Sequence, residues 1–206
     1  IVGDIDADKT EKKLKEIFNT IPKPENAAER IYYTVPDNKE PIIAIAKDKE
    51  ATGSQVTVYY KHKPMTKELK ATIAGIAGIY LKSVTSMMLN DRLKEISEKP
   101  NAPFMSAYSY DANFIVSKTM DAFTTMAVSK EGETQKALKA LLQETERVNR
   151  FGFTESEYER AKANLLSMIE SMYKEREKQK NNSYVEEYVS HFTDGGSICG
   201  IETDYM

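Results

Sequence analysis

The side chains that most often carry out catalysis or bind metals are scarce in this sequence. It holds two histidines, His62 and His191, and one cysteine, Cys199. Catalytic zinc sites usually draw on several histidine, cysteine or carboxylate ligands that lie close together, whereas these two histidines lie far apart in the chain. A single cysteine excludes an intramolecular disulfide and any site built from several thiolates. We therefore assign no catalytic and no metal-ligating residue, and leave the substrate-binding residues open.

Each of these three residues has a simple structural explanation. His62 is flanked by two lysines, which disfavours a cation, so we expect it on the surface. His191 follows Glu187 by four residues on a predicted helix, a spacing that suits a ligand pair, but no third ligand is spaced to join them. We expect His191 to face solvent. Cys199 has no basic neighbour to activate it as a nucleophile, and we expect an unpaired thiol.

A pair of aspartates near the start of the chain is a further candidate for acid-base or metal chemistry. Asp4 and Asp6 occupy alternate positions of a short predicted strand over residues 1–6 and would point the same way. A turn that ends the strand and caps the next helix explains both residues more simply. Asp8, with Glu11 three residues later, predicts the cap of a helix that continues to residue 21.

Composition limits the classes of protein to which the chain belongs. The 206 residues suit one or two domains of about 100 to 200 residues each, with 40% hydrophobic and 30% charged residues. Lys and Arg number 29 against 32 Asp and Glu, a net charge of -3. That balance disfavours a nucleic-acid-binding protein, which needs a basic face. No run approaches the roughly 18 apolar residues of a membrane-spanning helix.

The pattern of apolar residues predicts strands in two groups. The first group comprises residues 31–35, 42–47 and 55–61, the last with clear alternation. The second lies within 104–128, where Tyr108 and Tyr110 are in phase, residues 111–113 form a turn, and further strands follow around Phe114 and Val116 and at 123–128.

Helical patterns fill the rest of the chain. A long helix is predicted from Thr66 to Ile96, and its Gly75 and Gly78 indicate either a closely packed neighbour or a helix that tolerates both glycines. A third helix ends at Gly152 with an αL cap. A Ser/Thr-x-x-Glu capping box at 154–157 begins a fourth helix, and Ser183 with Glu186 caps a shorter one that ends at Gly195-Gly196.

Strands in runs, followed by helices, predict an α+β fold with helices packed on one face of a largely antiparallel sheet. The best boundary lies in the proline-rich, non-periodic stretch at 22–29. We therefore divide the chain into residues 1–24 and residues 25–206.

Four segments together resemble the insulinase/pitrilysin family of zinc metallopeptidases. They are the Val2-Gly3-Asp4 strand with the helix that ends at Ile21-Pro22, the "RL-x-E" helix end within 88–96, the stretch 101–108 that begins Asn-Ala-Pro-Phe, and the "G-x-T-x-x-E-L-x-x-A-K" helix start at 152–162. Tyr158 replaces the usual leucine of the last motif. The order and spacing of the segments cover nearly the whole chain.

The resemblance implies that the chain is mostly the second, non-zinc half-domain of such a peptidase. Residues 1–24 would end the preceding zinc-bearing half-domain, and residues 25–206 would form the second half, truncated at its C-terminus. The family's H-x-x-E-H motif is absent from the sequence. The resemblance thus implies no cofactor in this chain, zinc in the parent protein, and a chain that is inactive alone.

The resemblance also implies a role and partners. The half-domain would wall a peptide-degrading chamber and pack on the catalytic half, with the parent's remaining domains and peptide substrates as partners. Loops near 101–104 would touch substrate, whereas the family's substrate-contacting Arg and Tyr cannot be mapped onto Arg92 or Tyr108. Bacterial relatives favour the periplasm or cell envelope. Two alternatives stay open: a non-catalytic scaffold or partner subunit of the same fold, and an unrelated α+β binding module.

Overall fold

A computed structural model of the chain describes residues 1–70, 72–196, 198 and 200–205. In chain order its elements are α1 (Ala7–Phe18), β1 (Ser54–His62), α2 (Lys67–Lys70), α3 (Ile73–Ser97), β2 (Ser106–Asn113), β3 (Asp121–Ser129), α4 (Thr134–Phe151), α5 (Glu155–Lys174), a 3-10 turn η1 (Arg176–Lys178), α6 (Asn181–Asp194) and α7 (Ile201–Tyr205).

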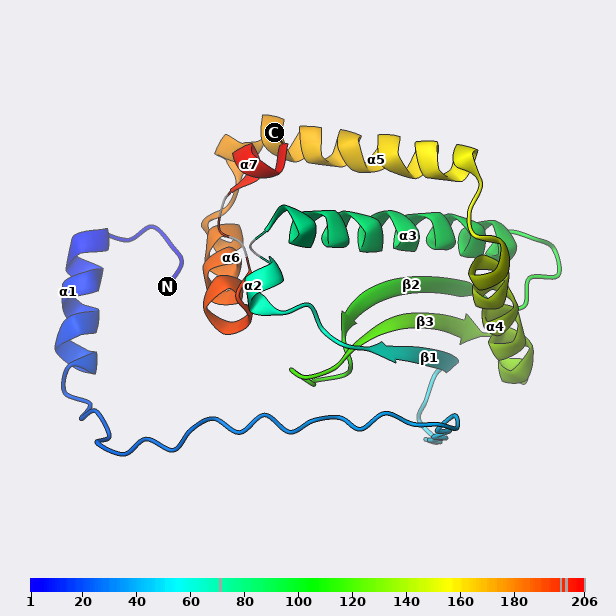
Figure 1. Cartoon of the computed structure of the whole chain (residues 1–206), viewed down its shortest axis with the longest axis horizontal. Coiled ribbons are helices and arrows are strands. Elements are labelled where there is room, and N and C mark those ends of the chain that lie inside the picture. The colour runs from blue at the N-terminus through cyan, green and yellow to red at the C-terminus, as the bar shows by residue number, and fades with distance from the viewer. Residues whose placement is uncertain (71, 197, 199, 206) are drawn as a thin grey trace.

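The three strands form one antiparallel sheet in the order β1-β3-β2. In Figure 1, α3 runs along the sheet, α4 crosses one end of it, and α5 lies on the far side of α3. Helices therefore cover one face of an antiparallel sheet, which confirms the predicted α+β class. The other face of the sheet carries no helix among the described residues.

The core forms where α3 and α4 meet the covered face of the sheet. Leu89 and Leu93 of α3 pack with Phe104, Ala127 of β3 and Leu141 of α4, all almost fully buried. Leu89 and Leu93 are four residues apart on α3, so their side chains share the face of the helix that meets the sheet. Their burial fixes α3 and α4 relative to the strands.

A second cluster joins α3 to α5. Val84 and Met88 of α3 pack against Ala161 and Leu165 of α5, where alanine permits close approach of the two helices. The two clusters share α3, which therefore has the sheet on one side and α5 on the other (Figure 1).

The two glycines of α3 lie under the turn that precedes the helix. Thr72 caps α3 by accepting a hydrogen bond from the Gly75 amide. A Cβ added to Gly75 would lie 2.2 Å from the carbonyl oxygen of Leu69, and one added to Gly78 would lie 2.7 Å from the terminal methyl of Met65. Of the two explanations left open, the closely packed neighbour is the correct one.

Several predicted strands of the N-terminal third are wrong. Residues 1–6, 31–35 and 42–47 form no strand in the part of the chain that the structure describes, whereas 55–61 lies within β1 as predicted. Residues 31–35 and 42–47 run as extended chain with exposed side chains, Tyr33 at 82% and Ile43 at 81%. A strand needs a neighbouring backbone at hydrogen-bonding distance, and an apolar pattern does not specify that neighbour.

The structure differs from the sequence prediction at one turn, one strand and one helix end. Residues 111–113 are the end of β2 rather than a turn, and the chain reverses at 114–120, where Ile115 takes a φ of 56°. The second predicted strand there, around Phe114 and Val116, is therefore absent. Gly152 has positive φ but extended ψ, so its cap is not αL.

Two helix starts also differ from prediction. Asp6, not Asp8, caps α1 by accepting from the Lys9 amide. The shorter helix α6 begins at Asn181, ahead of Ser183. It ends at its C-cap Gly195, which confirms the predicted end, and Gly195 takes the αL conformation there. The observed caps, Asp6 and Lys180, lie two residues before Asp8 and three residues before Ser183, each within a run of several polar residues.

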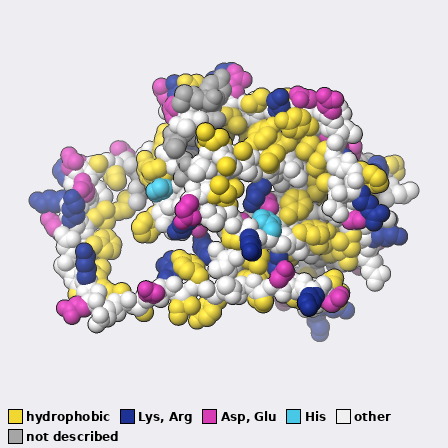
Figure 2. All heavy atoms as spheres, in the orientation of Figure 1, with side chains coloured by type: hydrophobic (Ala, Val, Ile, Leu, Met, Phe, Trp, Pro, Cys, Tyr) yellow, Lys and Arg dark blue, Asp and Glu magenta, His cyan; other side chains and the backbone are white. Residues whose placement is uncertain are grey.

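Many apolar side chains remain exposed. Figure 2 shows them gathered over the sheet and the α3–α5 layer. Among the most exposed are Ile73 of α3, Phe192 of α6 and Phe151 of α4. Among the described residues, no helix combines the length and apolar character required to cross a bilayer.

Candidate functional site

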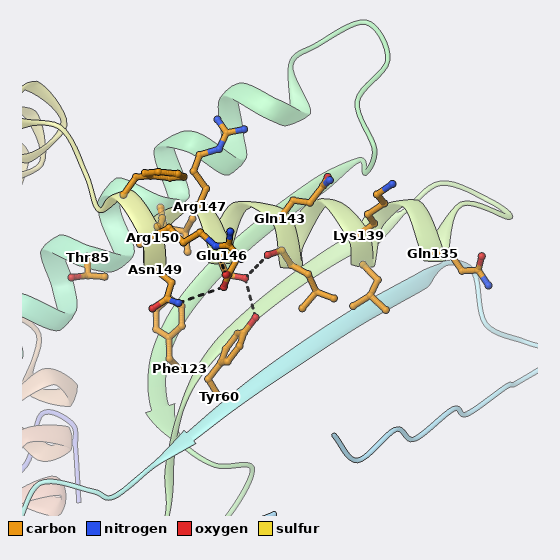
Figure 3. Close-up of a pocket in the computed structure, with 16 residues that line it drawn as sticks. Tyr60, Thr85, Phe123, Gln135, Lys139, Gln143, Glu146, Arg147, Asn149 and Arg150 are labelled. Atoms are coloured by element: carbon orange, nitrogen blue, oxygen red, sulfur yellow. Dashed lines mark hydrogen bonds and ion pairs between the residues drawn. The ribbon is translucent and has the colours of Figure 1, made fainter. Parts of the chain in front are cut away.

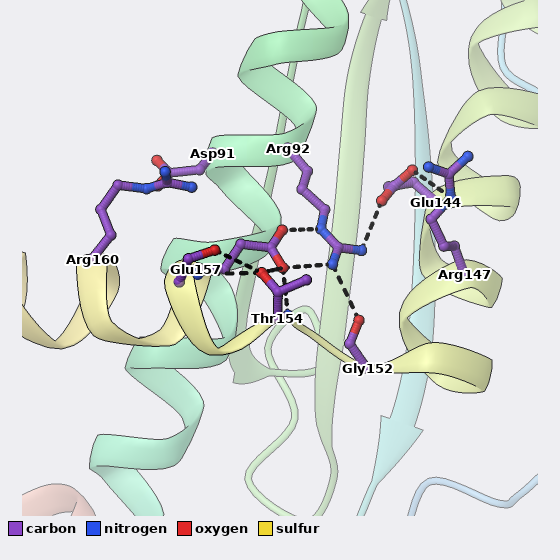
Figure 4. Close-up of polar contacts among 9 residues, drawn as sticks. Asp91, Arg92, Glu144, Arg147, Gly152, Thr154, Glu157 and Arg160 are labelled. Atoms are coloured by element: carbon purple, nitrogen blue, oxygen red, sulfur yellow. Dashed lines mark hydrogen bonds and ion pairs between the residues drawn. The ribbon is translucent and has the colours of Figure 1, made fainter.

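Arg92 and Glu157 form the most extensive polar contact between helices. Arg92 projects from α3, and Glu157 lies in the first turn of α5 (Figure 4). Arg92 Nε donates to Glu157 Oε1 at 2.5 Å, and Nη2 donates to Oε2 at 2.8 Å. Two parallel charge-assisted bonds fix the relative orientation of both groups.

The same guanidinium contacts two more elements. Arg92 Nη1 donates to Glu144 Oε1 of α4 at 3.2 Å, and Nη2 donates to the Gly152 carbonyl at 3.1 Å. The guanidinium carbon, Cζ, lies 4.8 Å from the centre of the Phe153 ring. One side chain, 17% exposed, therefore joins α3, α4, α5 and the α4–α5 connection. We call this set of contacts the Arg92 hub.

The capping box at the start of α5 is part of the hub. The Thr154 amide donates to Glu157 Oε2 at 2.7 Å, and the Glu157 amide donates to the Thr154 hydroxyl at 3.4 Å. The hydrogen bonds from Arg92, with those from Thr154, lower the pKa of Glu157 to about 2, against the opposing effect of burial. Hydrogen bonding to Glu157 likewise raises the pKa of Arg92.

The hub explains two of the sequence motifs. Arg92 belongs to the "RL-x-E" segment, and Gly152, Thr154 and Glu157 belong to the "G-x-T-x-x-E" segment. The structure brings the two segments together through side chains that hold helices in place. The Arg92 guanidinium is therefore engaged with carboxylates of the chain itself. The capping box was visible in the sequence, but its link to Arg92 was not.

A second polar cluster, missed in the sequence, lies at the end of the sheet. His62 Nε2 lies 2.8 Å from Asp111 Oδ2, and its Nδ1 lies 3.0 Å from the Lys63 carbonyl. Lys82 of α3 donates to Asp111 Oδ1 at 2.5 Å. The Asp121 carboxylate of β3 accepts a hydrogen bond from the side-chain amide of Asn113, its partner in β2. The prediction of a surface His62 is thus only partly correct, because its side chain is 35% exposed and engaged on both nitrogens.

These residues do not fit a zinc ion. Both ring nitrogens of His62 already face oxygen atoms of the chain, and Lys82 places a cation against the same carboxylate. His191 lies on α6, with its Nδ1 2.6 Å from the Gly196 carbonyl. Within the described part of the chain, no three histidine, cysteine, aspartate or glutamate residues are grouped to hold a metal.

The other candidates occupy structural positions. His191 is exposed, as predicted, and Asp6 is a helix cap. Cys199 lies outside the described residues. In the loop at 101–104, Phe104 is fully buried and Ala102 nearly so, which leaves Asn101 as its exposed member.

An open groove of about 1320 Å³ lies between α4, α3 and the sheet (Figure 3). Tyr60 and Phe123 rise into it from the sheet, and the Tyr60 hydroxyl lies 2.9 Å from the Thr145 hydroxyl of α4. Glu146 on its wall accepts from Arg150 at 2.5 Å, and this contact lowers the pKa of Glu146. The groove's carboxylate is thus paired along its own helix and is not free to perform chemistry.

The sequence profile described as the Peptidase M16 inactive domain matches residues 1–165. The chain therefore belongs to the Peptidase M16 inactive domain family. This family assignment confirms the resemblance to insulinase-type zinc peptidases and to their non-zinc half.

Individual relatives agree in fold. The chain is 29% identical to "Zinc protease PQQL-like" of Arabidopsis thaliana over 82% of its own length and 14% of that protein's. It superposes on the first half of the periplasmic protease PqqL from Escherichia coli with a TM-score of 0.72 and 16% identity, covering 98% of this chain and 42% of that one. A predicted insulinase family protease from Yersinia pestis gives 0.71 at 12% identity, covering 98% and 43%. The chain spans less than half the length of these proteins.

Proposed function

We propose that this chain is the inactive half-domain of a zinc-dependent peptidase, in which it packs on the catalytic half and walls the chamber where peptides are cleaved. Zinc and the catalytic base would belong to the catalytic half. The two parts of this chain, residues 1–24 and 25–206, would be the end of that half and the inactive half-domain. A periplasmic or envelope location would suit such a protein.

The observation that carries this proposal is the one-sided layering of the sheet. Helices α3 and α4 cover one face of the sheet (Figure 1), while the other face carries Tyr59, Tyr108 and Tyr110 and, among its described strand positions, a single charged residue, Lys61. Exposed apolar patches of this kind mark contact surfaces. A half-domain that packs on a neighbour needs exposed apolar surface of this kind, and the open sheet face supports its proposed place in a chamber wall.

The test uses the longer protein that we propose to contain this chain. Purified with zinc, it should cleave a quenched fluorescent peptide, lose activity on chelation and regain it when zinc is restored. The 206-residue chain alone should show no cleavage. Stoichiometric zinc binding and cleavage by the isolated chain would disprove the proposal.

The alternative of a non-catalytic scaffold predicts a different result in the same assay. A longer protein without an H-x-x-E-H motif would not cleave peptides in any metal condition. The fold would then serve assembly rather than proteolysis.

A further inference from the structure

The face of the sheet opposite α3 and α4 is formed by alternate residues of the three strands. Strand residues alternate between faces, and Ala127, Phe123 and Val56 point to the helices because they pack in the core. The alternate positions, which point away, are Gln55, Thr57, Tyr59 and Lys61 of β1, Ala122, Thr124, Met126 and Val128 of β3, and Ser106, Tyr108, Tyr110 and Ala112 of β2. We call this set the tyrosine face.

Tyrosines border the central strand of this face. Tyr59 and Tyr110 are both paired with Thr124 in the sheet register, so one ring stands on each side of it. Thr124 is 2% exposed, whereas Tyr59 is 42% and Tyr110 38% exposed. The rings therefore cover the centre and present their outer surfaces. Among the described residues of the tyrosine face, Lys61 alone carries a charge.

The rings are held by neighbours. Tyr108 and Tyr110 stack with centroids 6.0 Å apart, and Tyr59 meets Phe114 edge to face at 5.3 Å. The Tyr108 hydroxyl lies 3.6 Å from the sulfur of Met126. Pre-ordered tyrosines lose little side-chain entropy on binding and offer both apolar area and a hydroxyl.

An extended peptide segment already contacts this end of the sheet. Lys61 Nζ donates to the Pro36 carbonyl at 2.7 Å, and the Thr119 hydroxyl of the β2–β3 turn donates to the Tyr33 carbonyl at 2.8 Å. Both acceptors are main-chain atoms of the extended stretch between α1 and β1 (Figure 1). Contacts to main-chain carbonyls do not depend on the identity of the side chains in the bound segment.

We propose that the tyrosine face binds extended, uncharged peptide segments rich in apolar or aromatic side chains, and that residues 31–36 compete for it as a segment carried by the chain itself. In this structure Lys61 and Thr119 hold main-chain carbonyls of that segment, and most of its side chains are exposed. When such a segment is bound, Tyr59 and Tyr110 contact its side chains. The inference rests on the proposed function, because it names the class of peptide that such a chamber wall would favour.

The experiment measures binding to the intact 206-residue chain by fluorescence anisotropy. The probe is a labelled peptide with the uncharged sequence of residues 31–36, and the control probe carries glutamate in place of both tyrosines. The wild-type chain should bind the first probe saturably and the second weakly. Tyr59→Ala with Tyr110→Ala should weaken binding roughly tenfold. Tyr188→Ala, which removes an exposed tyrosine of α6, should leave it unchanged.

A second variant tests the internal occupant. A tethered segment competes at high effective concentration, so Tyr32→Ser with Tyr33→Ser should tighten binding of the added probe. Tyr110→Phe, which keeps the ring, controls for folding and should bind like wild type. No binding by either the wild-type chain or the serine variant would overturn the proposal, as would equal binding by the alanine variant.

Because this assay needs no catalytic half, its result is separable from that of the cleavage assay. Peptide binding without cleavage by the longer protein would contradict the proposed function alone. Cleavage without binding at the tyrosine face would contradict this inference alone.

Discussion

Arg92 and Glu157, which are 65 residues apart, share two hydrogen bonds of 2.5 and 2.8 Å between their charged groups. The pair connects α3, which covers the sheet, to α5, which packs on the other side of α3. Glu157 also closes the capping box of α5, so one carboxylate serves both local and tertiary structure. The stability of the helical layer should therefore depend on this contact more than on any surface ion pair.

Arg92→Ala should destabilise the fold by about 3 to 5 kcal/mol, because it leaves the largely buried Glu157 without its cation and leaves Glu144 with Arg147 alone, at 3.5 Å. Urea unfolding followed by circular dichroism measures the loss. Arg160→Ala is a matched control, since Arg160 lies half exposed on α5 and its ion pair with Asp91 spans 3.5 Å. It should cost less than about 1 kcal/mol. Equal losses in the two variants would contradict the role assigned to Arg92.

The low pKa of Glu157 predicts a dependence of stability on acidity. The hydrogen bonds from Arg92 lower this pKa from 4.5 to about 2, so the charged form is favoured in the folded chain. The resulting stabilisation is present above pH 4.5 and is lost as the pH falls towards 2. Glu157→Gln should flatten the fall in the unfolding midpoint as the pH drops from about 5 to about 2. This range spans the ordinary carboxylate pKa of about 4 and the lowered pKa of Glu157. An unchanged slope would contradict the pairing.

Gly75→Ala and Gly78→Ala should behave differently although both lie in α3. A Cβ on Gly75 would lie 2.2 Å from a backbone carbonyl, so we expect a loss of about 1 to 3 kcal/mol. A Cβ on Gly78 meets only the flexible end of Met65, and alanine favours the helix by about 1 kcal/mol. Thermal unfolding of both variants checks the contrast, and a stabilised Gly75→Ala would be incompatible with the close turn.

Thr125→Val should leave stability unchanged or raise it by about 1 kcal/mol. The Thr125 hydroxyl is buried and has no hydrogen-bond partner among the described residues, so its desolvation is not compensated. Ser109→Ala is the control, because its hydroxyl donates to Asn90 at 3.1 Å and its removal should be destabilising. Chemical denaturation distinguishes the two, and a marked loss in Thr125→Val would show that the hydroxyl is bonded in solution.

The features that the sequence predicted correctly are those that depend on residues close together in the chain. The capping box at Thr154 and Glu157, the helix end at Gly195 and the strand that became β1 all depend on residues within a few positions of one another. The fold class followed from the order of these elements. The resemblance to the peptidase family followed from motifs that are themselves local.

The wrong predictions concern residues whose structure depends on contacts with residues far away in the sequence. Residues 31–35 and 42–47 have a strand pattern, but their backbone groups have no neighbouring strand among the described residues. Asp111 and Asn113 suggested a turn, yet Asp111 lies in a strand, where its carboxylate accepts a hydrogen bond from Lys82 and lies 2.8 Å from His62 Nε2. Neither partner is close to Asp111 in sequence. The hub and the sheet-end cluster were missed for the same reason.

The central claim is that this inactive half-domain completes a peptidase by packing on its catalytic half. The most direct measurement is peptide hydrolysis by a separately purified catalytic half to which the 206-residue chain is added. We predict a rate that rises with added wild-type chain and saturates at a one-to-one ratio, and a smaller rise with the destabilised Arg92→Ala variant. A catalytic half that is equally active without the chain, with no complex on size-exclusion chromatography, would contradict the claim.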